Sequence, residues 1–70
     1  MNRLEQLVNE GNVLKVLDYL KQFGISNKKI SDISGVHFTT VHNYKKGLFE
    51  MGEDKQKQIL DTVREVFLNV

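Results

Sequence analysis

The segment from residue 27 to residue 47, NKKISDISGVHFTTVHNYKKG, constrains the fold of this chain more than any other stretch. Gly35 divides it; a small residue, Ser31, lies four positions earlier, and an aliphatic residue, Val41, lies six positions later. Two short helices that cross at a tight turn need a small side chain at the crossing, a turn residue that tolerates positive φ, and an aliphatic residue facing the first helix. The spacing therefore predicts a helix–turn–helix.

The same segment supplies a small core between its two helices. Val36, directly after the glycine, is expected to fill the crevice between them, and an isoleucine and a tyrosine complete the apolar contact. The predicted core of the motif consists of Ile30, Ser31, Gly35, Val36, Val41 and Tyr44.

Apolar residues at helical spacing predict two helices before this motif. Residues 2–9 form a short amphipathic helix, with leucine and valine at i, i+3 and i+4. Asn12 is expected to cap a second helix, with Phe23 at the end of its apolar face and Gly24 just beyond it. Ser26 or Asn27 is expected to cap the first helix of the motif.

The last third of the chain predicts one more helix. Residues 47–52 read as a loop whose Leu48, Phe49 and Met51 tuck against the core. Acidic residues at 53 and 54 favour a helix start, because carboxylates offset the positive end of the helix dipole. The apolar residues of this helix recur at 3.6-residue spacing and are Ile59, Leu60, Val63, Val66, Phe67 and Val70.

These elements predict an all-α fold, a compact bundle of about five short helices containing a helix–turn–helix. Residues 1–70 are expected to form a single domain with the motif at residues 27–47 and the second motif helix at residues 38–45. No stretch alternates apolar and polar residues in the manner of a strand, and the sequence contains no proline. It contains no cysteine either, so no disulfide can staple so small a core.

Positive charge is concentrated in the motif, although the formal net charge of the chain is only +1. Residues 27–47 contain four lysines and one aspartate, a net charge of +3, whereas residues 48–70 carry a net charge of −2. A helix–turn–helix presents its second helix to the major groove, so double-stranded DNA is the first partner that the sequence predicts. The motif would then face the phosphates and the acidic last segment would face away.

The stretch ISNKKISDISGVHFTTVHNYKKG, about a third of the chain, resembles the motif of the Cro/repressor-type (lambda-repressor-like) helix-turn-helix family of phage and bacterial regulators. Asn27, Ser31 and His37 stand where that family often has glutamine, alanine and serine. The family often continues with two helices after the motif, and this chain has room for one.

The resemblance implies a transcriptional regulator, expected to be a repressor from a phage or mobile element that binds an operator as a homodimer. The half-sites would lie about 34 Å apart, with residues 38–45 in the major groove. The residues expected to contact bases are His37, Phe38, Thr39, His42 and Asn43. The residues expected to hold phosphates are Asn27, Lys28, Lys45 and Lys46.

Two assignments stay open at this point. Phe38 stands where a polar residue is usual, so its ring packs on a thymine methyl group, is buried against the protein, or contacts a second copy of the chain. The apolar stripe of the last helix is first a core face, and a second copy of the chain is the alternative partner for it.

Other classes of function find less support. The sequence shows neither a glycine-rich phosphate loop nor a paired nucleophile and base, so an enzyme is not expected. His37 and His42 are five positions apart, which suits a helical zinc pair poorly, and no metal, cofactor or small-molecule ligand is expected. The remaining alternatives are a protein-interaction module that reuses the fold, and an accessory DNA-binding factor of the excisionase or replication type.

The N-terminus mixes both charge signs and lacks the apolar core of a signal peptide. No apolar run approaches the roughly 20 residues needed to span a bilayer. The chain is therefore expected to be cytoplasmic, with no membrane partner.

Overall fold

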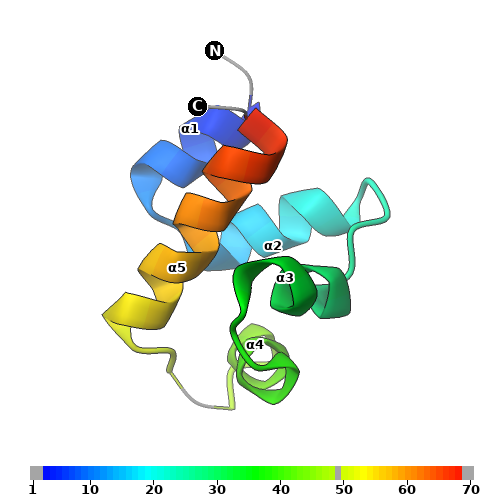
Figure 1. The fold of residues 1–70 in the computed structure, drawn as a ribbon, viewed down its shortest axis with the longest axis vertical. Coiled ribbons are helices and arrows are strands. Elements are labelled where there is room, and N and C mark those ends of the chain that lie inside the picture. Colours follow the sequence, from blue (N-terminus) through cyan, green and yellow to red (C-terminus); the bar gives the residue numbers. More distant parts are fainter. Residues whose placement is uncertain (1–2, 49, 69–70) are drawn as a thin grey trace.

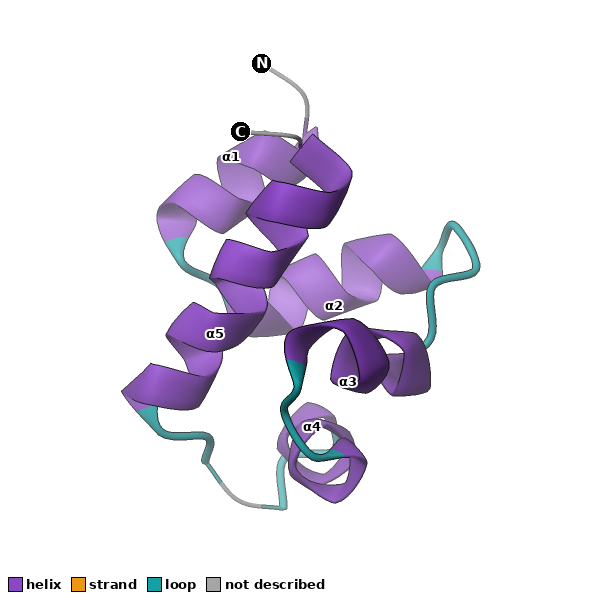
Figure 2. Ribbon diagram, viewed as in Figure 1, coloured by secondary structure: helices purple, strands orange, loops and turns teal. Residues whose placement is uncertain are grey.

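The computed structural model describes residues 3–48 and 50–68, and all regular secondary structure in these residues is helical. The helices are α1 (Arg3–Glu10), α2 (Val13–Lys21), α3 (Asn27–Ser34), α4 (Phe38–Lys45) and α5 (Glu53–Val63), and α5 continues into a π-helical turn, η1 (Arg64–Leu68). The predicted all-α class is confirmed (Figure 2). No helix in the described ranges is long and apolar enough to cross a membrane.

Side chains cap the helix starts that the sequence predicts. Asn12 Oδ1 accepts a hydrogen bond of 3.1 Å from the backbone N–H of Lys15 at the start of α2. Ser26 Oγ accepts one of 3.2 Å from the N–H of Lys29, so Ser26, not Asn27, caps α3. Each cap satisfies one of the backbone donors that a helix leaves free in its first turn.

One core cluster lies where α5 crosses the other helices. In Figure 1, α5 runs obliquely past α1 and α2, and η1 lies beside α1, while α3 lies in front of α2 and α4 lies below α3. The buried hydrophobic residues come from all five helices and from two connecting segments. They are Leu4, Leu7, Val8, Val13, Val16, Leu17, Leu20, Ile30, Val36, Val41, Met51, Ile59 and Val63.

Three apolar side chains do not take the positions that the sequence predicts for them. Leu48 is 68% exposed because the turn at the end of α4 directs it outward, and Met51 fills the core instead. Phe23 lies beyond the last residue of α2 and therefore does not extend the apolar face of that helix. The centroid of its ring is 5.1 Å from that of Tyr19. Val66 is 52% exposed, because the wider π-helical turn shifts the register by which the apolar stripe was predicted.

Two predicted core residues, Phe49 and Val70, lie outside the described residues. The predicted burial of Ile59 and Val63 is confirmed, and Leu60 and Phe67 are partly buried against the same cluster. The last helix therefore covers the core with its first eleven residues, and its apolar stripe is in the main a core face.

Candidate nucleic-acid interface

The turn between α3 and α4 is held by its own backbone and by two serines. Gly35 adopts φ +79°, a left-handed conformation that glycine accepts without strain, and its N–H donates to the carbonyl of Ser31 at 3.0 Å. Ser31 Oγ donates to the carbonyl of Val36 at 2.6 Å, and Ser34 Oγ accepts from the N–H of Val36 at 3.2 Å. The small residue at position 31 thus leaves room at the crossing and also ties the two sides of the turn together.

Helix α5 braces this turn from behind. Gln58 Nε2 donates to the carbonyl of Ser34, the last residue of α3, at 2.6 Å. A Cβ atom built on Gly35 would approach the same Nε2 to 3.2 Å, which is tighter than ordinary van der Waals contact. Glycine therefore suits position 35 for two reasons: it adopts the positive φ of the turn, and it leaves space for the side chain of Gln58.

Helix α4 lies across α3 and turns one face inward. Val41 is fully buried and Tyr44 is partly buried against the core, as the sequence predicts. In Figure 2, α4 is seen almost end-on below α3, so the two helices cross and do not run parallel. The opposite face of α4 carries Thr39, which is exposed, and Asn43, which is half-buried.

His37 has a structural task that the sequence interpretation missed. It is the residue that caps α4, and its Nδ1 accepts a hydrogen bond of 3.2 Å from the N–H of Thr39. The predicted role of His37 was base contact. In this geometry Nδ1 is occupied by the helix, and only Nε2 can meet an outside partner.

Phe38 and His42 form a ring pair on the outer surface of α4. Their ring centroids are 5.4 Å apart, and the ring planes differ by 22°. Phe38 is 40% exposed, so its ring is not fully buried against the protein, and contact with DNA or with a second copy of the chain stays a prediction. The imidazole of His42 makes no hydrogen bond to any residue within ranges 3–48 and 50–68.

A groove of about 430 Å³ lies between the start of α3 and the side of α4 that carries Phe38 and His42. Asn27 and Lys28 line it from α3, and Phe38 and His42 line it from α4. Lys21, from the last turn of α2, completes the wall, although no sequence signal distinguishes it from other surface lysines. The structure thus brings together four of the predicted contact residues and adds a third element to the site.

The lysines expected to hold phosphates differ in their ion pairs and in their exposure to solvent. The ammonium group of Lys28 lies 3.9 Å from the carboxylate of Asp32, and both side chains are largely exposed. Lys45 makes an ion pair with Asp18 of α2, and its side chain is only 24% exposed. Lys46 is exposed. The predicted phosphate contacts of Lys45 and Lys28 therefore both compete with a carboxylate of the chain, but the Lys28 pair is longer and far more exposed to water.

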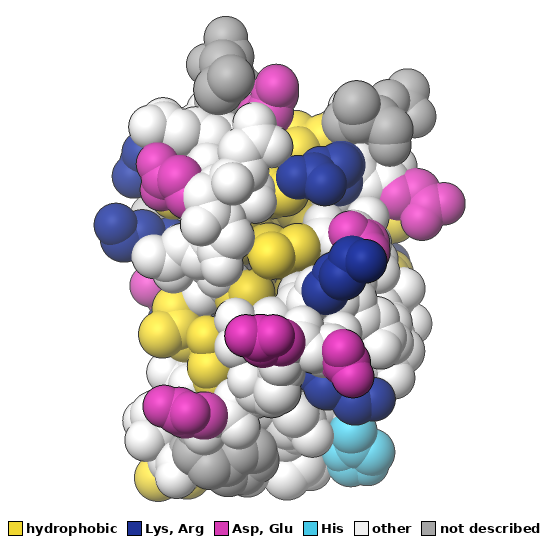
Figure 3. Space-filling model, turned by 90° about the vertical axis from the view of Figure 1, so that its left-hand side faces the viewer, with side chains coloured by type: hydrophobic (Ala, Val, Ile, Leu, Met, Phe, Trp, Pro, Cys, Tyr) yellow, Lys and Arg dark blue, Asp and Glu magenta, His cyan; other side chains and the backbone are white. Residues whose placement is uncertain are grey.

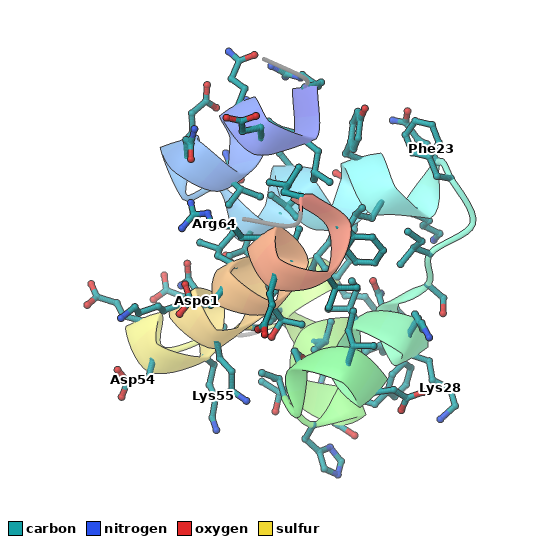
Figure 4. The ribbon with its side chains drawn as sticks, turned by 45° about the horizontal axis from the view of Figure 1, so that its top comes forward. Phe23, Lys28, Asp54, Lys55, Asp61 and Arg64 are labelled. Carbon is teal, nitrogen blue, oxygen red and sulfur yellow. The ribbon has the colours of Figure 1, made fainter. Side chains whose placement is uncertain are left out.

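The carboxylates of α5 lie away from the groove beside α4. Figure 4 shows Lys28 on the opposite side of the ribbon from Asp54 and Asp61 of α5. Figure 3 looks onto the side of the molecule that holds α5, where acidic side chains are spread among lysines and arginines around a band of hydrophobic surface. The wall of the groove beside α4 combines two lysines, the polar side chains of Ser26, Asn27 and His42, and the apolar ring of Phe38, and it contains no carboxylate.

The described residues contain no group of three or more histidine, cysteine, aspartate or glutamate side chains that could hold a metal ion. Comparisons with protein-family models, with curated proteins and with solved structures each returned no match.

Proposed function

We propose that this protein is a sequence-specific, double-stranded DNA-binding transcriptional regulator that places α4 in the major groove. The observation that carries the proposal is the groove between the start of α3 and the outer face of α4, with Lys21 and Lys28 in its wall. Phosphates of one strand would lie against these lysines and against the free N–H groups at the start of α3. The outer face of α4 would then meet the edges of the bases.

The dimensions of α4 support this placement. Like any α-helix, α4 is about 10–12 Å in diameter with its side chains, so it fits the major groove, which is about 12 Å wide. Asn43 offers the amide that bonds adenine through two hydrogen bonds, and Thr39 offers a methyl and a hydroxyl group. Both lie on the face opposite the buried Val41.

Repression is the mode of regulation that we propose, because a protein bound at a promoter excludes polymerase without any further surface. A homodimer would read two half-sites about 34 Å apart. The homodimer, like the origin in a phage or mobile element, rests on the resemblance of the motif and stays a prediction.

The proposal separates residues that read bases from residues that hold phosphates. Asn43→Ala should relax the preference at one base pair, at a cost of about 1–3 kcal/mol at that position. Lys21→Gln should weaken binding to all sequences about equally and make the salt dependence shallower by about one unit of log–log slope. Fluorescence anisotropy on duplexes with single base-pair changes measures both. If Asn43→Ala weakens every duplex equally, its assignment to a base edge is wrong.

A protein-interaction module is the second candidate, and exposed hydrophobic side chains favour it. Leu48 and Phe23 are 68% and 66% exposed, and neither lines the groove beside α4. A chain that served only as such a module would show no salt-sensitive affinity for duplex DNA. The same titration at low salt therefore decides between the two functions.

A further inference from the structure

Phe38 and His42 form a pair of stacked rings on α4. Phe38 is the first residue of α4 and His42 lies one turn later, so both rings project on one side of the helix. Their planes are nearly parallel and their centroids are 5.4 Å apart. Each ring restrains the other, and less side-chain freedom is lost when a ligand contacts a restrained ring.

The two rings offer different chemistry to a ligand. Phe38 presents an apolar ring that is 40% exposed and stacks on His42. His42 presents ring nitrogens that are free of hydrogen bonds to the described residues. An apolar surface beside a hydrogen-bonding group is the complement of a methyl group beside a hydrogen-bond acceptor.

The major groove offers this combination at one kind of step. Thymine carries a 5-methyl group there, and guanine presents its N7 and O6 acceptors. Neighbouring base pairs are about 3.4 Å apart along the axis, so two rings stacked along a helix can contact two successive pairs. The groove wall places the ring pair next to Lys28 and Asn27, which would hold the strand that carries these bases.

We infer that Phe38 and His42 act as one unit that reads a thymine methyl group next to a guanine. Phe38 covers the methyl group, and His42 donates a ring N–H to guanine N7. The inference rests on the proposed function, because it names the base step that the same surface of α4 would select.

The test removes one methyl group from the DNA. A duplex enriched from random sequences is prepared with each thymine replaced in turn by uracil, which differs only in lacking the 5-methyl group. Affinity is measured by fluorescence anisotropy for the unmodified chain and for Phe38→Ala. One uracil should weaken the unmodified chain about fourfold, which corresponds to about 0.8 kcal/mol for one buried methyl-sized group. The same uracil should leave Phe38→Ala unchanged within twofold.

Two further measurements sharpen the assignment. Replacing the neighbouring guanine by 7-deazaguanine, which lacks the N7 acceptor, should weaken the unmodified chain but not His42→Ala. Phe23→Ala is the matched control, because Phe23 is also an exposed phenylalanine but lies outside α4 and outside the groove wall. It should keep the full sensitivity to uracil.

The outcomes separate the inference from the function on which it rests. If the chain binds the duplex with salt-dependent affinity and no uracil weakens it, the inference is overturned and the proposed function stands. If a uracil weakens the unmodified chain and Phe38→Ala equally, Phe38 does not read the methyl group and the inference is again overturned. If no duplex is bound at low salt, both are rejected.

Discussion

At the scale of single residues, His37 shows how a histidine can stabilise the start of α4 as its N-cap. Serine is the usual residue at this position in the family that the motif resembles, and an N-cap serine supplies an oxygen acceptor. Here the imidazole Nδ1 supplies the acceptor for the N–H of Thr39. The same chemical need is met by a different side chain.

Removing this cap should destabilise the fold. We expect His37→Ala to lower the free energy of unfolding by about 0.5–2 kcal/mol, the usual cost of losing an N-cap acceptor. His37→Asn should recover most of the loss, because asparagine caps helices well. Urea unfolding followed by circular dichroism measures both variants. Equal stability of His37→Ala and the unmodified chain would show that the Nδ1 contact does not stabilise α4.

Lys45 is the residue whose environment differs most from its predicted role. It pairs with Asp18, which is 27 positions away in sequence and belongs to another helix. Ion pairs near the surface contribute only about 0–1 kcal/mol, so a phosphate can compete for the same lysine. The affinity for DNA should therefore depend on the residue at position 18.

Releasing Lys45 should strengthen binding. We expect Asp18→Asn to raise the affinity for duplex DNA and to steepen the log–log salt dependence by about 0.9, the value for one more neutralised phosphate. Asp61→Asn is the matched control, since it changes the net charge equally on α5, where the carboxylate lies on the opposite side from Lys28 (Figure 4). A steeper slope in both variants, or in neither, would contradict the competition.

At the scale of elements, α5 contacts the end of α3 and the turn that follows it. Gln58 of α5 bonds to the end of α3 beside Gly35. The amide of Gln58 thus bonds to α3 and occupies the space that a Cβ atom at Gly35 would crowd. This brace joins the part of the chain proposed to meet DNA to the helix that covers the core.

Adding a methyl group at the turn should therefore cost more than backbone strain alone. We expect Gly35→Ala to destabilise the fold more than Gly11→Ala, because both have positive φ but only Gly35 has a close neighbour, Gln58. A left-handed alanine costs about 1–2 kcal/mol by itself, which is the expected effect at Gly11. Thermal unfolding of the two variants compares them directly. Equal losses would mean that Gln58 moves aside without cost.

The helices could be predicted from local patterns because their causes are local. Asn12, the acidic pair at residues 53 and 54, and the apolar spacing around Val41 each act within a turn or two of helix. The π-helical turn that rotates Val66 into solvent could not be predicted, since the apolar repeat continues through it without a break. A register change of this kind is decided by packing against α1, which the repeat does not encode.

At the scale of the whole molecule, the site is assembled by tertiary contacts. The placement of Asn27, Lys28, Phe38 and His42 around one groove could be predicted, because all four belong to one helix–turn–helix segment, and their contact with DNA stays a prediction. Lys21 and the pairing of Lys45 with Asp18 could not, because α2 meets the motif only in the folded chain. The candidate site is thus a groove between α3 and α4 of the helix–turn–helix, and Lys21 of α2 forms part of its wall.

Charge is also organised at this scale. The net charge of +1 divides unevenly along the chain, with +3 in residues 27–47 and −2 in residues 48–70, although lysines and arginines lie among the carboxylates on the side of α5 (Figure 3). An excess of positive charge in the motif favours an approach to a polyanion through α3 and α4. The homodimer that we predict would place two such motifs on one duplex, and the symmetry of the bound sequence would report it.

The most direct test of the central claim is a selection of bound sequences from random duplexes, followed by titration of the enriched duplex and a shuffled duplex at several salt concentrations. The account predicts one enriched sequence, bound at least about 10³-fold more tightly than the shuffled duplex. It also predicts an affinity that falls with salt by a log–log slope of about −0.9 for each neutralised phosphate. Failure to enrich any sequence, or equal affinity for the enriched and shuffled duplexes, would contradict it.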